Sequence, residues 1–212
     1  MKKILTLFLI LCSFAVLAQT TKGSFMIGGN GNVNFNNSVK TDDSQNPKAF
    51  SFGLSPTVGY FPVKNFAFGL SLPFDVSWSK RSWDNTSPPE KSKSHGYSIS
   101  AAPFVRYYIP VKKLFIVTQA SYGWTYSNSE YTITETTTGV VTYSDENTVK
   151  GKYYTLSAGP AFFLNPYTSI EFLANYQSQD WDAASTNFVQ PYHQSTWYVS
   201  VGFQIYLPSN KE

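Results

Sequence analysis

Two side chains near the carboxyl end of the chain have the types and the spacing of a nucleophile and its general base. His193 and Ser195 stand two positions apart, and histidine and serine are residue types that can act as base and nucleophile. Such a pair also needs a carboxylate to orient the histidine, which Asp180 or Asp182 in the preceding polar stretch could supply. Isolated histidines at strand ends are more often solvated, so we expect no enzymatic activity and keep a hydrolase as the alternative.

Three charged residues interrupt segments that otherwise alternate between apolar and uncharged polar residues. They are Asp75, Arg106 and Glu171. Arg106 shortly precedes one predicted short turn and Glu171 shortly follows another, so both belong to the same end of their strands. If the strands enclose a narrow interior, the two would meet across it as an ion pair. We interpret the three as a structural charge network, with a gate or an ion relay as the alternative.

The remaining motifs predict no cofactor and no metal site. The stretch "GGNGNV" (28–33) lacks the third glycine of a dinucleotide fingerprint and opens no helix, so its glycines are expected to serve strand packing. The acidic residues of the polar stretches do not have the spacing of a calcium loop, and we expect a solvated face. These residues are Asp42, Asp43, Glu130, Glu135, Asp145 and Glu146.

The amino terminus predicts export. "MKKILTLFLILCSFAVLA" has two lysines, a short apolar run and a small residue at its end, which is typical of a secretory signal peptide cleaved after Ala18. The run is too short for a membrane-spanning helix. We therefore expect a signal peptide at 1–18 and one domain at 19–212, and Cys12, the single cysteine, leaves with the signal.

The composition is unusual for a soluble domain. Charged residues make up 14% of the chain and aromatic residues 17%, whereas soluble domains carry roughly 25% charged residues. The formal charge is +3, and without Lys2 and Lys3 it falls to nearly zero. No basic stripe indicates a nucleic-acid partner. So little charge predicts that much of the surface does not face water.

Alternating segments recur along the whole chain and predict an all-β fold. Each is long enough for a tilted strand of about 9–11 residues to cross a bilayer. The eight segments are 23–35, 49–61, 66–79, 96–109, 114–127, 152–164, 168–179 and 194–207. Short connections (61–65, 109–113 and 164–168) alternate with long polar ones (36–48, 80–95, 128–151 and 180–193). This pattern predicts an eight-stranded antiparallel up-and-down transmembrane β-barrel.

Two details qualify this pattern. Pro56, Pro103 and Pro160 fall inside predicted strands, where a missing N–H normally marks an edge, and we expect bulges or bends there. The threonine-rich "YTITETTTGVVTYS" (131–144) also alternates, which predicts a protruding hairpin that could recruit a partner by strand addition.

The residue types on the two faces of each segment predict which face contacts lipid and which faces the barrel interior. In "FMIGGNGNVNF" (25–35), Phe25, Ile27 and Val33 alternate with Asn30, Asn32 and Asn34. The polar set along the chain is glycine, serine, threonine, asparagine and glutamine, which suits a narrow interior. Aromatic girdles are expected at the two interfaces. They are Trp78, Trp83, Trp124, Trp181 and Trp197, with Tyr97, Tyr126 and Tyr154, at one end, and Tyr60, Phe61, Phe66, Tyr107, Tyr108, Tyr167 and Tyr206 at the other.

The chain resembles the small eight-stranded outer-membrane β-barrels of the OmpX/OmpA type and the barrel domains common in Bacteroidetes. The residues that carry this resemblance are the signal peptide, "GLSPTVGYFPVKNFAFGLSL" (53–72), "PFVRYY" (103–108) and "SVGFQIYL" (200–207). It implies a monomer in the bacterial outer membrane, in contact with lipopolysaccharide, whose last strand is read by the barrel-assembly machinery. That strand lacks the terminal aromatic residue typical of the signal.

The resemblance implies architecture more than activity. A structural or interaction role through external loops, in adhesion, envelope integrity or defence, is the expected function, with a narrow small-solute channel as one alternative. The other is a lipid-modifying enzyme, because "HQS" (193–195) resembles the His-x-Ser of the outer-membrane lipid A deacylase. At the position of that enzyme's carboxylate, twelve residues after Ser195, this chain has Leu207.

Overall fold

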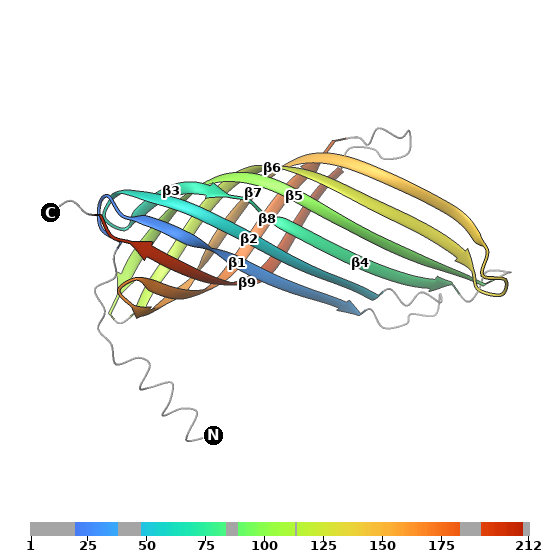
Figure 1. Cartoon of the computed structure of the whole chain (residues 1–212), viewed down its shortest axis with the longest axis horizontal. Coiled ribbons are helices and arrows are strands. Elements are labelled where there is room, and N and C mark those ends of the chain that lie inside the picture. Colours follow the sequence, from blue (N-terminus) through green and yellow to red (C-terminus); the bar gives the residue numbers. More distant parts are fainter. Residues whose placement is uncertain (1–19, 38–47, 84–88, 113, 183–191, 210–212) are drawn as a thin grey trace, which may run out of the picture.

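The computed structural model describes residues 20–37, 48–83, 89–112, 114–182 and 192–209, which form one antiparallel sheet (Figure 1). Its strands are β1 (Phe25–Asn37), β2 (Lys48–Val63), β3 (Phe66–Ser71), β4 (Phe74–Trp83), β5 (Glu90–Val111), β6 (Leu114–Glu135), β7 (Val141–Asn165), β8 (Thr168–Trp181) and β9 (Tyr192–Leu207). Within the described ranges, no helix is long and apolar enough to cross a membrane. The expected signal peptide, 1–18, lies outside them.

The sheet closes on itself. β1 pairs with β2 along its length and with β9 from Phe25 opposite Leu207 to Gly31 opposite Val201. β3 and β4 form one crossing interrupted at Leu72 and Pro73, because both pair with β2 on one side and with β5 on the other. Proline has no N–H for the ladder. The predicted ring of eight antiparallel strands is therefore confirmed.

The strands extend beyond their predicted ends on the side of the long connections. β6 and β7 stay paired as far as Thr134 opposite Val141, so most of 128–151 is a long hairpin, as the alternation around its threonines predicted (Figure 1). The other ends are joined by tight turns. Asn65 and Lys112 adopt positive φ angles of 65° and 51° in two of these turns, a conformation that asparagine tolerates better than most residues.

The three strand prolines interrupt pairing without shifting it. Between β5 and β6 the paired residues stop at Ala101 and resume at Phe104 in the same register, and Pro160 has an equivalent gap between β7 and β8. Opposite Pro56 lies the break between β3 and β4. Since no residue is inserted, the expectation of bulges or bends at these prolines is wrong for the bulges, and the bends stay a prediction. The missing N–H leaves a local gap in the ladder.

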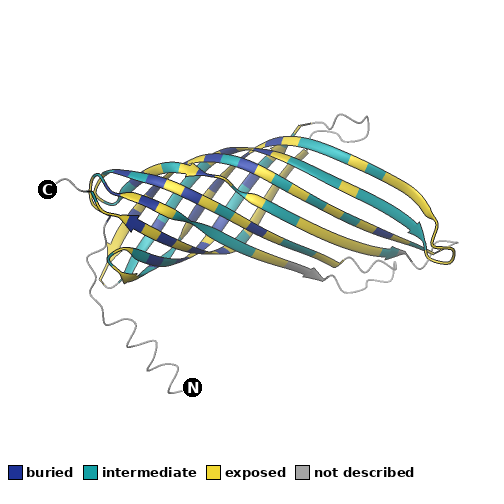
Figure 2. Cartoon of the chain, in the orientation of Figure 1, coloured by how far each residue is buried: buried dark blue, intermediate teal, exposed yellow. Residues whose placement is uncertain are grey.

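Burial alternates along every strand, with the polar residues inside (Figure 2). The most deeply buried inward polar residues are at most 7% exposed: Thr57, Ser71, Ser100, Thr125, Thr155, Ser157, Asn175, Ser200 and Gln204. The outward apolar set, here called the outward belt, is at least 40% exposed and includes Phe25, Ile27, Leu54, Val58, Phe68, Leu70, Ile99, Val105, Leu156, Phe172, Val201 and Phe203. The predicted orientation of the two faces is confirmed.

The interior at the short-turn end is apolar. It is filled by Met26, Phe61, Ala67, Phe104, Tyr108, Val117, Ala161, Leu173 and Tyr206. The predicted girdle is therefore partly wrong: Tyr107 and Tyr167 are 46% and 47% exposed, but Phe61, Tyr108 and Tyr206 are fully buried. Successive residues of a strand face opposite sides, so Tyr107 and its neighbour Tyr108 cannot both face outward.

At the end of the barrel that carries the long connections, the predicted outward position is confirmed for three tryptophans. Trp78, Trp124 and Trp197 are exposed on the outward face. Trp181 instead lines the interior, stacked on Tyr192 with ring centroids 6.2 Å apart. The side chain of Trp83 lies outside the described residues.

Candidate functional site

A buried ion pair spans the interior just above the apolar core. Arg106 on β5 and Glu171 on β8 are fully buried, with Nη1 of the arginine 3.0 Å from Oε2 of the glutamate. Non-adjacent strands supply the two charges, so the contact crosses the barrel. The structure thus brings together two of the three charged residues singled out in the sequence.

Neighbouring side chains satisfy most of the remaining hydrogen-bonding groups of this pair. Arg106 donates from Nε to Oε1 of Gln119 at 2.7 Å and from Nη1 to the hydroxyl of Tyr108 at 3.1 Å. Tyr108 donates to Glu171 at 3.1 Å, and Tyr206 donates to Tyr108 at 3.0 Å. We call these five residues the lumen cluster. A buried charge needs a partner and hydrogen bonds, and within the lumen cluster both charges have them.

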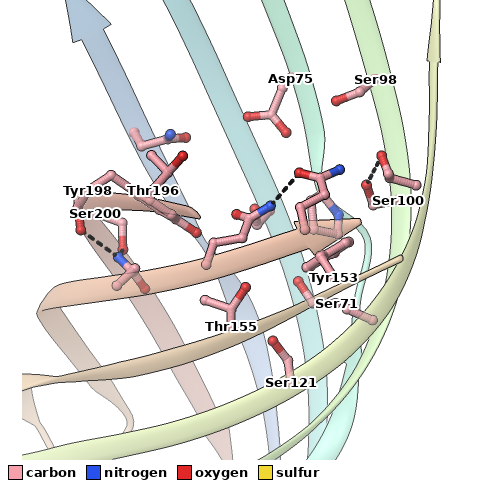
Figure 3. A pocket seen from close by; sticks show the side chains of 18 of the residues that line it. Ser71, Asp75, Ser98, Ser100, Ser121, Tyr153, Thr155, Thr196, Tyr198 and Ser200 are labelled. Carbon is pink, nitrogen blue, oxygen red and sulfur yellow. Dashed lines mark hydrogen bonds between the residues drawn. The ribbon is translucent and has the colours of Figure 1, made fainter. Parts of the chain in front are cut away.

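Asp75 does not belong to the lumen cluster. It lines a cavity of about 420 Å³ together with Ser71, Ser98 and Ser100 (Figure 3). Gln119 is the one member of the lumen cluster that also lines this cavity. No salt bridge links Asp75 to another residue in the described part of the chain. The expected network of three charges is therefore wrong for Asp75, because its strand position places it nearer the open end.

The cavity wall is almost entirely uncharged and polar. Serine, threonine, asparagine and glutamine side chains from every strand except β4 contribute to it, and Tyr153, Trp181 and Tyr198 are its large members (Figure 3). Sequence reasoning missed both tyrosines. The signal was present, since Tyr153 and Tyr198 share the alternation of the inward Thr155 and Ser200.

A second cluster lies on the outward face of β8 and β9 near the long-connection end. His193 pairs with Asp180 across the two strands, and Ser195 pairs with Ser178. Nδ1 of His193 is 2.7 Å from Oδ1 of Asp180, and Nε2 is 3.3 Å from Oγ of Ser195. The structure therefore places the two candidate residues together and supplies a carboxylate from Asp180. Asp182 instead donates its backbone N–H to the carbonyl of Lys150.

Two further residues complete this arrangement. Oγ of Ser178 is 3.2 Å from Nε2 of His193, and the hydroxyl of Tyr176 donates to Oγ of Ser195 at 3.2 Å. We call Tyr176, Ser178, Asp180, His193 and Ser195 the rim cluster. Ser178 is 4% exposed, whereas the side chains of His193 and Asp180 are 58% and 79% exposed. The cluster is therefore accessible from outside the barrel.

The other histidine has a simpler environment. Nε2 of His95 is 3.1 Å from Oε2 of Glu130, and both side chains are about half exposed. Within the described ranges, no three histidine, cysteine or acidic residues are grouped so that they could hold a metal ion.

No protein-family model and no curated protein sequence matches the chain. Among solved structures, it is similar to the outer membrane protein OprG from Pseudomonas aeruginosa, with 10% identity and a TM-score of 0.49 over 91% of this chain and 99% of that chain. It is also similar to Neisserial surface protein A (15% identity, TM-score 0.36, 87% and 97% covered). Ail, the attachment invasion locus protein of Yersinia pestis, gives 17% identity, a TM-score of 0.36 and coverage of 87% and 99%.

The likeness to these proteins is confined to the fold. The eight-stranded ring itself rests on the strand pairing described above.

Proposed function

We propose that this chain is an integral barrel of the bacterial outer membrane whose sealed interior supports an external interaction surface. The observation that carries the proposal is the outward belt. Large apolar side chains are at least 40% exposed on every strand crossing, while the polar residues are inside. In water such a surface would drive association, because soluble proteins rarely expose contiguous apolar patches of this extent. A hydrocarbon environment makes the same surface favourable.

The lumen cluster favours a barrel with a closed interior rather than a channel. Arg106 and Glu171 are fully buried, and the apolar core that includes Phe61 and Leu173 fills the interior on the short-turn side of them. An eight-stranded ring has room for little more than its own side chains. The polar cavity on the other side is then a pocket that faces the long connections, which we assign to the cell exterior.

The hairpin of β6 and β7 supports the interaction role. Pairing between β7 and β8 begins at Gly151 opposite Trp181, so within the described ranges the stretch 141–150 has β6 as its strand neighbour. Val141 and Tyr143 are 55% and 48% exposed there. The outer edge of residues 141–145 has no second strand beside it among the described residues. An edge of this kind can accept a strand of another protein, in adhesion or in another contact at the cell surface.

The proposal includes the route to the membrane and the oligomeric state. The last strand, β9, closes the ring against β1 and carries apolar Ile205 and Leu207 on its outward face, which suits recognition by the barrel-assembly machinery. A closed ring leaves no strand edge in the bilayer for association, so a monomer in contact with lipopolysaccharide is proposed.

The membrane claim is tested on the mature protein expressed with its own signal peptide. We expect recovery in the outer-membrane fraction, extraction only with detergent, and a gel mobility that changes on heating because the folded barrel resists the detergent. A protein that remains in solution without detergent and shows no heat-dependent mobility would contradict the proposal. Removal of residues 131–143 should leave the heat-dependent mobility intact while abolishing adhesion to surfaces that the full chain binds.

A further inference from the structure

The rim cluster contains a hydrogen-bonded chain from a serine hydroxyl to a carboxylate. Ser195 Oγ contacts Nε2 of His193 at 3.3 Å, and Nδ1 of His193 contacts Asp180 at 2.7 Å. An ionised carboxylate only accepts, so Nδ1 carries the proton and donates it to Asp180. Nε2 then presents its lone pair to two hydroxyls, those of Ser178 at 3.2 Å and Ser195 at 3.3 Å, and can take a proton from Ser195. The contacts therefore match the roles of nucleophile, general base and orienting group in acyl transfer.

Accessibility distinguishes the two serines beside His193. Ser178 is 4% exposed and lies beneath the imidazole, so a substrate cannot reach its hydroxyl. Ser195 is exposed. Ser178 is a positioning residue that holds His193 over the sheet, and Ser195 is the residue that can attack.

The position of Ser195 relative to the outward belt points to a class of substrate. Trp197 and Val199, the next outward residues along β9, are 74% and 67% exposed. Ser195 lies one outward position beyond Trp197, about 7 Å along the strand. Tryptophan prefers the interface between hydrocarbon and water, which is also where the ester groups of membrane lipids lie.

We propose that Ser195, His193 and Asp180 form an esterase site that removes an ester-linked acyl chain from a lipid of the outer leaflet. This substrate class depends on the membrane location proposed above. The acyl chain would lie along the outward belt beside Trp197, while the head of the lipid faces the polar end of β8 and β9.

The reaction balances with water as the co-reactant. Oγ of Ser195 bonds to the ester carbonyl carbon as Nε2 of His193 takes the hydroxyl proton. The bond from that carbon to the alkoxy oxygen then breaks, and the alkoxy oxygen leaves with the proton from Nε2. Water attacks the resulting acyl-serine, gives a proton to Nε2 and releases the fatty acid, and Ser195 regains its proton.

Tyr176 is placed to stabilise the negative oxygen that forms during attack. Its hydroxyl donates to Oγ of Ser195 at 3.2 Å, so a carbonyl bound at Ser195 comes within reach of the same donor. The ring is held by Trp197, with centroids 4.9 Å apart, and by Tyr154 at 6.2 Å.

The edge of β9 leaves this region open on one side. Its pairing with β1 ends at Gly31 opposite Val201, and beyond that point β8 is its strand neighbour within the described ranges. Figure 1 shows β1 and β9 diverging there. Ser195 therefore lies beyond the last β1–β9 pair, at the long-connection end of the ring, where among the described residues β9 is paired with β8 alone. A lipid can approach Ser195 there from the outward face.

The test uses the full mature barrel, folded in detergent and checked by heat-dependent gel mobility. A fluorophosphonate probe and a p-nitrophenyl butyrate assay report the nucleophile without any lipid. Vesicles of phosphatidylethanolamine and phosphatidylglycerol, prepared with and without lipopolysaccharide, report the lipid substrate through released fatty acid measured by mass spectrometry. We expect probe attachment at Ser195 and fatty acid release, both abolished by Ser195→Ala and His193→Ala.

Further variants separate positioning from folding. Asp180→Asn should slow hydrolysis about 10²–10⁴-fold because the imidazole loses its orientation, and Asp180→Glu should restore part of the rate. Tyr176→Phe should lower kcat about 10²-fold with little change in KM. His95→Ala, which removes the other histidine of a histidine–carboxylate pair, should leave the rate unchanged.

Each contrary outcome has a distinct meaning. A folded barrel that takes no probe and cleaves neither ester overturns the site. Probe attachment at Ser195 with intact vesicle lipids overturns the lipid substrate. Hydrolysis of p-nitrophenyl butyrate by a protein that fails to enter vesicles would instead contradict the membrane location and leave the serine site standing.

Discussion

Arg106 and Glu171 meet across the interior of the barrel, with Nη1 and Oε2 3.0 Å apart and both side chains fully buried. Sixty-five residues separate them in the sequence. Their strands come close because the ring is narrow. This contact joins opposite walls, so it ties the barrel together at one level in a way that neighbour-to-neighbour hydrogen bonds do not.

Arg106→Ala should lower the free energy of unfolding by about 3–5 kcal/mol, because it leaves the Glu171 carboxylate buried without its cation. Urea unfolding of the protein in lipid vesicles measures this loss. Glu130→Ala removes one partner of the exposed pair with His95 and should change stability by at most about 1 kcal/mol. Equal losses in the two variants would contradict a stabilising role for the buried pair.

The folded protein should show no ion conductance in planar bilayers, because the lumen cluster and the apolar core close the interior. Replacing Tyr108 and Tyr206 with alanine should produce measurable conductance, because their rings fill space between Glu171 and the short turns. Discrete channels in the unmodified protein would show that the interior is open. Tyr107→Ala, on the outward face, is the matched control and should remain closed.

Arginine substitutions at two exposed valines test which parts of the outer surface contact lipid and which contact water. Val201 on β9 and Val141 at the tip of the β6–β7 hairpin are 49% and 55% exposed. In a bilayer, Val201→Arg should cost about 2–4 kcal/mol of folding free energy, because the charge would lie in hydrocarbon. Val141→Arg should change the folding free energy by no more than about 0.5 kcal/mol. Similar small effects in both variants, measured by unfolding in vesicles, would argue against a membrane environment around Val201.

Glycines on the two faces should differ in their tolerance of a methyl group. A Cβ at Gly69 would meet the backbone carbonyl of Val58 and the ring of Phe104, whereas at Gly31 the nearest atom is the carbonyl oxygen of Gly53 at 3.8 Å. Gly69→Ala should therefore destabilise the barrel by about 1–3 kcal/mol. Gly31→Ala should be neutral or slightly stabilising, because it restricts the unfolded chain. The same vesicle unfolding assay compares them, and the reverse order would mean that the close approach at Gly69 is relieved by movement.

The alternation of side chains was readable from the sequence because it is a local property of an extended chain. Residues two apart share a face whatever the rest of the molecule does. The uncharged polar face marked by Asn30, Ser100 and Ser157 therefore predicted the interior, and the strict alternation of short and long connections predicted a closed ring. The same locality allowed the Arg106 and Glu171 positions to be assigned to one end of the barrel.

Relations between strands were not readable in the same way. The sequence left open whether Asp180 or Asp182 stands beside His193, and the register of β8 against β9 decided for Asp180. It grouped Asp75 with the buried ion pair, but the tertiary structure places Asp75 in the polar cavity. It also assigned Tyr108 and Tyr206 to an outer girdle, although both are inside. Alternation within a strand determines which side chains share a face, and it can be read from the sequence. Which side chains meet across strands or across the interior depends on the strand register and on the stagger of the closed ring, and only the tertiary structure supplies these.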